Sequence, residues 1–242
     1  MHVDKCLFSG DEAPVNKKKR LECLFEPIVL KAGKLLGFEL VIKNDELENP
    51  VRADHYLYGM TPSQKVKIFF EQVTIACLNA SIFTDNDLLL AINIDYEIAL
   101  HICNNISIRN ILTENDYIRL EVNEVFPELG PGKRRPLLHK LGQYCPLWLD
   151  NFGCGQTSLS LIMNENFEYI KISKSFFWQH QGTFSLKQMV SYLQPYCKGS
   201  IVNGVENSQH IEYLNTVDIQ AMQGLLWLPY TQDKLSHSAT FF

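Results

Sequence analysis

The segment 149–155, Leu-Asp-Asn-Phe-Gly-Cys-Gly, combines residue types that can place a carboxylate beside a bound ligand. Asp150 follows directly on an apolar run, and the two glycines after it allow the backbone to turn sharply beneath a ligand. A carboxylate delivered in this way to the mouth of a sheet is typical of a site for a divalent cation.

Three more polar side chains stand near the C-terminal ends of other predicted strands: Glu39, Asn93 and Glu121. Together with Asp150 they offer three carboxylates and one carboxamide, a reasonable set of oxygen ligands for Mg²⁺ or Mn²⁺. Because active sites of parallel barrels form at the C-terminal ends of the strands, we expect these four side chains to meet.

Short apolar runs that alternate with longer amphipathic runs predict the elements that position these residues. Strands are expected at 24–30, 36–42, 88–94, 118–123, 147–150, 169–172, 200–203 and 221–225. Helices are expected at 61–79, 135–144, 186–194 and 208–214. This alternation predicts an α/β chain with a mainly parallel, closed barrel. Only the short turn 31–34 separates the first two strands, so they should form an antiparallel hairpin.

A series of short motifs resembles, in order, those of EAL domains, the bacterial phosphodiesterases that open cyclic di-GMP. They are Glu-Pro-Ile at 26–28, Gly-Phe-Glu-Leu-Val-Ile-Lys at 37–43, Ala-Ile-Asn-Ile at 91–94, Leu-Glu-Val-Asn-Glu at 120–124, Asp-Asn-Phe-Gly-Cys-Gly at 150–155, Tyr-Ile-Lys-Ile-Ser at 169–173, Asn-Gly-Val-Glu at 203–206 and Gln-Gly at 223–224. The resemblance implies an EAL-type modified (β/α)8 TIM barrel with an antiparallel first strand pair. It divides the chain into a polar leader at 1–20, a barrel domain at 21–230 and a C-terminal tail at 231–242.

The resemblance also assigns a role to individual residues. Four match the family's ligands for the first of two cations: Glu39, Asn93, Glu121 and Asp150. Lys171 matches the catalytic lysine that holds the attacking water, and Glu124 matches the glutamate that steadies the loop after Asp150. Glu206 and Gln223 keep the identity that the family has at those positions.

Other positions depart from the family pattern. Asn151 and Asn203 replace carboxylates that serve the second cation, and Ser173 replaces the aspartate after the lysine. Lys43 stands where the family holds a phosphate of cyclic di-GMP with Arg, and lysine cannot form the same bidentate fork. Asp95 adds negative charge in place of a serine. We therefore expect no two-metal hydrolysis, weak or absent cyclic di-GMP binding and no cofactor, with the first site as the place where Mg²⁺ or Mn²⁺ could still bind.

Structural interpretations of the same residues stay open. Glu121 and Glu124 suit an ordinary charged strand end, and Asp150 suits a helix cap. Lys171 could serve as an ion-pair partner for Asp150 or Glu206. Without a cation, the carboxylates of the first-metal set would repel one another.

Composition excludes several classes of protein. A chain of 242 residues with 46% hydrophobic residues can bury one substantial core, and its net charge of −5 gives no general attraction to nucleic acid. No stretch approaches the ~18 apolar residues of a membrane span, and the first residues lack the apolar core of a signal peptide. Seven cysteines without a Cys-x-x-Cys pair indicate reduced thiols in the cytoplasm.

Two functional hypotheses follow. The first is an EAL-like interaction protein, because small stand-alone degenerate EAL proteins bind FlhD of the flagellar activator FlhDC and repress flagellar genes and motility. The second is a weak cyclic di-GMP phosphodiesterase or receptor that uses the first-metal site. For the partner surface we single out Phe177 and Trp178, since exposed aromatic residues are enriched at binding hot spots. The tail is expected to be frayed.

Overall fold

The structure is a computed structural model that describes residues 22–42, 59–130, 132–155, 162 and 166–237. The predicted leader at 1–20 and the predicted phosphate contact Lys43 lie outside these residues. We therefore describe the barrel, the helices around it and the first part of the tail.

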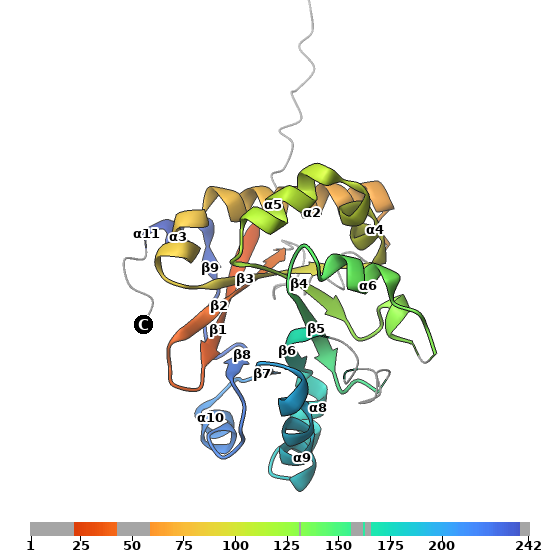
Figure 1. Cartoon of the computed structure of the whole chain (residues 1–242). Helices are drawn as coiled ribbons and strands as arrows, with labels where there is room; N and C mark the ends of the chain where they lie inside the picture. The colour runs from red at the N-terminus through yellow and green to blue at the C-terminus, as the bar shows by residue number, and fades with distance from the viewer. Residues whose placement is uncertain (1–21, 43–58, 131, 156–161, 163–165, 238–242) are drawn as a thin grey trace, which may run out of the picture.

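Eight of the strands within the described residues close into a barrel, and a ninth short strand adds to its first strand (Figure 1). The strands are β1 Cys23–Leu30, β2 Leu35–Ile42, β3 Leu89–Ile94, β4 Ile118–Asn123, β5 Leu147–Phe152, β6 Phe167–Ile172, β7 Gly199–Asn203, β8 Ala221–Gln223 and β9 Tyr230–Thr231. Neighbours from β2 to β8 follow one another in sequence order and pair in parallel. β1 closes the barrel between β8 and β2.

β1 runs antiparallel to both of its barrel neighbours. It pairs with β2 over most of its length through the turn that contains Gly33, whose φ of 88° lies in the left-handed region that glycine adopts without strain. The predicted barrel with an antiparallel first strand pair is confirmed.

Helices cover the outside of the barrel. They are α2 Pro62–Leu78, α3 Ala80–Asp85, α4 Tyr96–Asn104, α5 Ile106–Glu114, α6 Pro136–Leu141, α8 Lys174–His180, α9 Phe184–Leu193, α10 Ser208–Leu214 and α11 Gln232–His237. Figure 1 shows α2, α4 and α5 grouped on one side and α8 and α9 on the opposite side. In the part of the chain that the structure describes, no helix is long and apolar enough to cross a membrane.

The start of α2 illustrates how local sequence sets these boundaries. Thr61 and Gln64 form a capping box: the Thr61 hydroxyl accepts from the Gln64 N–H, and the Gln64 side chain accepts from the Thr61 N–H. Pro62 then occupies the first helical position, where its missing N–H costs nothing. The predicted helix start is therefore confirmed to within one residue.

The interior of the barrel consists of an apolar layer beneath a polar layer. The apolar layer is a separate buried cluster formed by Ile28, Ala91, Trp148, Tyr169, Ile201 and Ala221. On β1 a polar residue lies two positions before the apolar one, and on the other strands it lies two positions after. These polar residues are Glu26, Asn93, Asp150, Lys171, Asn203 and Gln223. Since side chains alternate between the two faces of a strand, each pair projects to the same interior. The apolar layer thus forms the floor of the polar one.

The first part of the tail is ordered, which contradicts the expected fraying. β9 pairs with β1 through Tyr230 and Thr231, and α11 follows at once. Leu235 on α11 is buried in the main core. A single apolar residue in a short polar helix gives little periodic signal, so only the packing against β1 reveals this element.

Glu168 ties three neighbouring strands together at the N-terminal end of the barrel. Its carboxylate pairs with the Arg119 guanidinium, accepts from Trp148 Nε1 at 2.9 Å and lies 2.8 Å from Lys198 Nζ. Burial alone would raise the pKa of Glu168, but these donors outweigh it and hold the pKa below its usual value. A carboxylate with a lowered pKa stabilises the fold above the unfolded-state pKa, and that stabilisation is lost as the pH falls through the folded-state pKa.

Glu168→Gln should therefore lower the free energy of unfolding at pH 7 by about 3 kcal/mol, because it leaves the largely buried Arg119 guanidinium without its counter-charge. It should also flatten the loss of stability in urea titrations as the pH falls below 4.5, the ordinary pKa of a glutamate. The exposed Glu212→Gln is the matched control and should cost less than ~0.5 kcal/mol. An unchanged pH profile in Glu168→Gln would contradict this account.

Candidate functional site

Lys171 is the centre of the polar layer at the barrel mouth. Its side chain is fully buried, and its Nζ lies 2.5 Å from Glu39 Oε2 and 3.0 Å from both carboxylate oxygens of Glu121. Asp150 Oδ1 lies further away, at 4.0 Å. The three carboxylates of the predicted first-metal set therefore surround one ammonium group.

Side-chain amides complete the surroundings of Glu39. Asn93 Nδ2 donates to Glu39 Oε1 at 2.7 Å, and Gln223 Nε2 donates to Glu39 Oε2 at 2.8 Å. Gln223 Nε2 also lies 3.1 Å from Glu26 Oε2, which links β8 to β1 and β2. Asn93 thus acts here as a donor to a carboxylate.

Side-chain amides also donate to Asp150. They belong to Asn151 and Asn203, where the resemblance leads us to expect carboxylates. Asn151 Nδ2 donates to Asp150 Oδ2 at 2.9 Å, and Asn203 Nδ2 lies 3.4 Å from Asp150 Oδ1. Asn151 also has a φ of 58°, in the left-handed region where Asn is favoured over most other non-glycine residues. Carboxylates at these two positions would repel Asp150, whereas the amides bind it.

The charges at the mouth shift the ionisation of its members. Burial by itself would lower the pKa of Lys171, but the carboxylates of Glu121, Glu39 and Asp150 outweigh it, so the pKa is raised. Burial raises the pKa of Glu121, and the nearby carboxylates of Glu39 and Asp150 add to the shift against the opposing effect of Lys171. Lys171 therefore keeps its positive charge, and this one ammonium does not balance the negative charge of the three carboxylates around it.

Two of the structural alternatives can now be judged. The carboxylates do repel one another, since Glu39 and Asp150 raise the pKa of Glu121, but the Lys171 ammonium offsets this repulsion. Of the two ion-pair partners predicted for Lys171, Asp150 lies at the edge of ion-pair distance, at 4.0 Å, and the closer partners are Glu39 and Glu121. Glu206 pairs instead with Lys174, whose Nζ lies 2.7 Å from Glu206 Oε1.

The loop after Asp150 contacts the glutamate that the resemblance assigned to it. The Gly153 N–H donates to Glu124 Oε2 at 3.3 Å. Gly153 has a φ of 99°, and a Cβ there would lie 2.9 Å from Cγ of Phe176. Both the backbone conformation and the packing against α8 therefore require glycine at this position.

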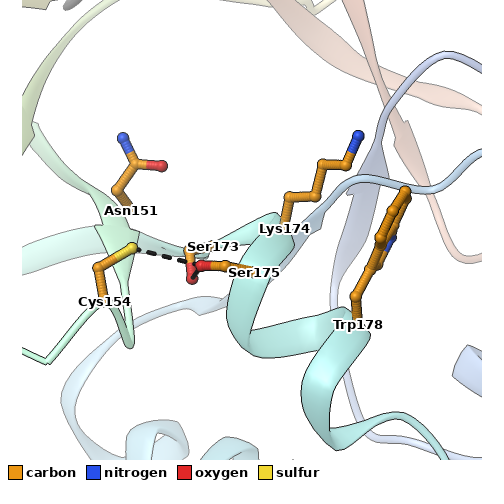
Figure 2. A pocket seen from close by; sticks show the side chains of 6 residues that line it. All are labelled: Asn151, Cys154, Ser173, Lys174, Ser175 and Trp178. Atoms are coloured by element: carbon orange, nitrogen blue, oxygen red, sulfur yellow. Dashed lines mark hydrogen bonds between the residues drawn. The ribbon is translucent and has the colours of Figure 1, made fainter.

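A hollow of about 410 Å³ lies beside this loop, between the ends of β5 and β6 (Figure 2). Its lining consists of Asn151, Cys154, Ser173, Lys174, Ser175 and Trp178. Lys174 Nζ lies 4.1 Å from the centre of the Trp178 ring, and the two side chains form one wall of the hollow (Figure 2). The lining residues carry hydroxyls, a thiol, an amide, an ammonium and an indole, but the surface that faces the hollow is mainly apolar.

The two aromatic partner candidates differ in exposure. Phe177 is fully buried and packs edge-on against His210, so its prediction as a surface residue is wrong. Trp178 is 41% exposed, and its indole N–H donates to the Gly204 carbonyl at 2.8 Å. The helical turn of α8 points adjacent side chains in different directions, so only one of the pair can face the core.

Sequence analysis missed a group of exposed leucines. Leu225 and Leu228 are 61% and 82% exposed in the loop after β8. The neighbouring Leu226 N–H donates to the Val205 carbonyl, next to the Gly204 carbonyl that Trp178 binds. We call Trp178, Leu225, Leu226 and Leu228 the apolar rim. The sequence signal is the run Leu-Leu-Trp-Leu-Pro at 225–229. Its apolar residues suit a continuation of the strand predicted at 221–225, but β8 ends at Gln223 and the run that follows Gly224 forms a loop.

Comparison with known proteins agrees with this architecture. The sequence model of the EAL domain matches residues 12–230. The chain belongs to the EAL-domain family. The YdiV protein of Escherichia coli is 26% identical over 212 residues, covering 85% of this chain and 90% of that one. The cyclic di-GMP phosphodiesterase PdeH of Escherichia coli is 26% identical over 210 residues, covering 83% and 80%. The anti-FlhC(2)FlhD(4) factor YdiV of Salmonella arizonae is 23% identical over 220 residues, covering 88% and 93%.

Solved EAL structures share the fold. The EAL-like domain protein YdiV superposes with a TM-score of 0.78 at 23% identity, covering 89% of this chain and 94% of that one. The phosphodiesterase PaMucR in its complex with c-di-GMP gives a TM-score of 0.67 at 22% identity, with the same coverage. At these identities the likeness establishes the barrel.

The residues present do not fit the two cations that membership of the family implies. The place between Glu39 and Glu121 is taken by an ammonium group, and Asp150 faces two amide N–H₂ groups. Among the described residues, no group of three or more His, Cys, Asp or Glu side chains is arranged to hold a metal ion. We therefore derive no hydrolytic step through such ions.

Lys171→Met should lower the free energy of unfolding by about 3–5 kcal/mol, because it leaves buried carboxylates without their counter-charge. Lys174→Met is the matched control: Lys174 also pairs with a glutamate, but its side chain is 43% exposed, so the cost should stay below ~1 kcal/mol. Urea unfolding at pH 7 measures both. Equal losses in the two variants would contradict the central position of Lys171.

Proposed function

We propose that this chain is an EAL-fold regulator without hydrolytic activity, which binds FlhD of the flagellar activator FlhDC in the cytoplasm and represses flagellar gene expression and motility. The similarity to anti-FlhC(2)FlhD(4) factors supports this, because it covers most of both chains. A protein partner also suits a chain whose negative net charge disfavours direct nucleic-acid binding.

The observation that carries the loss of hydrolysis is the pairing of Asp150 with Asn151 and Asn203. Two-metal hydrolysis needs carboxylates that neutralise both cations. Here two positions that would supply such charge carry neutral amides, and their N–H₂ groups occupy the oxygens of the remaining aspartate. Lys171 Nζ donates to Glu39 and Glu121, two of the carboxylates that the first cation would need.

The apolar rim is the surface that we propose for the partner. Trp178, Leu225 and Leu228 are exposed, and segment 204–205 accepts hydrogen bonds from both the Trp178 indole and the Leu226 backbone, which ties α8 and the loop after β8 to the same stretch of backbone. A few buried aromatic and aliphatic anchors carry most of the energy in typical interfaces. Leu78 on α2 is also exposed but lies on a different element, and scattered exposed apolar residues are normal for a protein surface.

A second candidate function is that of a cyclic di-GMP receptor or slow phosphodiesterase. It is favoured by the equal similarity to PdeH and by the hollow in Figure 2, where Lys174 and Trp178 offer a cation and an aromatic face to a phosphate and a base. The loss of charge at Asn151 and Asn203 argues against hydrolysis but leaves simple binding open to measurement.

The purified protein should hydrolyse cyclic di-GMP at least ~1,000-fold more slowly than PdeH assayed in parallel with Mg²⁺ or Mn²⁺. Losing about 4 kcal/mol of transition-state stabilisation from metal chemistry corresponds to that factor. The measurement is formation of the linear product, with calorimetric titration of cyclic di-GMP as the separate test of binding. Turnover close to that of PdeH would overturn the proposed function.

Trp178→Ala and Leu228→Ser should each weaken FlhD binding by at least ~10-fold, the effect of removing an interface anchor worth about 1.4 kcal/mol. Leu78→Ser is the matched control, since Leu78 is 73% exposed on α2, on the other side of the barrel from α8 (Figure 1). Asp150→Asn changes the mouth without changing the rim and should leave binding intact.

Co-purification, titration with FlhD and swimming motility measure these effects, with folding checked by circular dichroism. If folded Asp150→Asn loses FlhD binding and repression, the mouth takes part in the mechanism and the receptor hypothesis gains first place. If Trp178→Ala and Leu228→Ser both bind FlhD normally, the rim is not the interface.

A further inference from the structure

The barrel mouth contains a donor for each oxygen of the three carboxylates in the first-metal set. Glu39 accepts from Asn93, Gln223 and Lys171, and both oxygens of Glu121 accept from Lys171. The two oxygens of Asp150 accept from Asn151 and Asn203. All these donors belong to the chain itself. A site that awaits a hard cation would instead direct oxygen atoms toward it.

Lys171 Nζ competes with any cation that Glu39 and Glu121 would share. A divalent ion held by the same carboxylate oxygens, at the usual ~2.1 Å, would lie within ~5 Å of an ammonium that is already 2.5 Å and 3.0 Å from them. Two positive centres at such a distance repel even with a high effective dielectric constant. The buried ammonium therefore disfavours a cation at this place.

We propose that the Lys171 ammonium takes the place of the first cation, so that this chain holds its barrel mouth together without a divalent metal. The amides of Asn151 and Asn203 do the same for Asp150 by donating to it. The inference gives a physical reason for the proposed loss of hydrolysis, but its test measures metal binding and stability, so the two can fail separately.

Two unused acceptors indicate what would happen if the ammonium were removed. Asn203 Oδ1 and Gln223 Oε1 are buried and have no hydrogen-bond partner among the described residues. They project from neighbouring positions of β7 and β8, beside the three carboxylates. Carboxylate and carboxamide oxygens together form a ligand set that suits Mn²⁺. Removing the ammonium should therefore open a site that the wild-type chain keeps closed.

The test compares thermal unfolding of the full chain in EDTA and in Mn²⁺. Wild type should unfold at the same temperature in both. Lys171→Met should unfold at a lower temperature in EDTA and recover by about 5–10 °C at Mn²⁺ concentrations ~100-fold above its dissociation constant. Lys174→Met is the control for an unspecific effect of losing a lysine, and it should show no response to Mn²⁺.

Each other outcome decides against the proposal. Wild type that gains as much from Mn²⁺ as Lys171→Met shows that the ammonium and the cation coexist. A folded Lys171→Met that ignores Mn²⁺ shows that no cation position lies beneath the ammonium.

A second pair of measurements applies if Lys171→Met does not fold. Calorimetric titration of wild type with Mn²⁺ should give no binding heat, and saturable heat would overturn the proposal. Asn151→Asp combined with Asn203→Glu keeps Lys171 and replaces only the donors to Asp150, so it should create measurable Mn²⁺ binding beside Asp150. If this double variant binds no Mn²⁺, the part of the proposal that assigns the two amides to Asp150 in place of a cation is overturned.

Discussion

The burial of one ammonium among three carboxylates is the constraint on which the barrel mouth depends. Lys171 has no contact with solvent, so neither its charge nor that of Glu39 and Glu121 can be screened by water. Taking charges out of water costs several kcal/mol for each ion, and only close pairing with full hydrogen bonding repays that cost. The geometry satisfies this condition, since β2, β4 and β6 bring the three groups within hydrogen-bond distance. Neutral amides add further donors: Asn93 on β3 binds the Glu39 oxygen that the ammonium does not reach, and Gln223 on β8 binds the oxygen that it does reach.

Strand alternation makes this arrangement possible. In six of the barrel strands, β1, β3 and β5 to β8, the residue that reaches the mouth is two positions from a residue of the apolar floor, as Lys171 is from Tyr169 and Asp150 is from Trp148. The floor excludes water from below, which strengthens the electrostatic interactions above it. The Glu168 cluster at the opposite end holds β4, β5 and β6 together. Displacing one strand would therefore disturb the charge pairing at the mouth.

Much of the fold could be predicted from sequence, because it depends on local patterns. The strands and the antiparallel hairpin follow from period-two runs and a short turn, and the polar residues at strand ends follow from the same register. The partners of Lys171 could not be predicted, since Glu39 and Glu121 are far from it in sequence and only barrel closure brings them together. The exposure of Trp178 against the burial of Phe177 depends on how α8 is rotated. The packing of Leu235 on β1 depends on tertiary contact alone.

The structural role of the mouth changes what family identity can prove about activity. Glu39, Glu121 and Lys171 are residues that a hydrolase of this family needs, but in this chain they also need one another. Replacing any one of them leaves buried charge unpaired, which costs the fold several kcal/mol whether or not a substrate is ever hydrolysed. A matching residue at these positions therefore carries no information about catalysis by itself. The informative positions are Asn151 and Asn203, where a neutral amide satisfies Asp150 and a carboxylate would be needed for a second cation. Those two amides stabilise the barrel mouth through Asp150, which is the property that the proposed role as a binding protein requires.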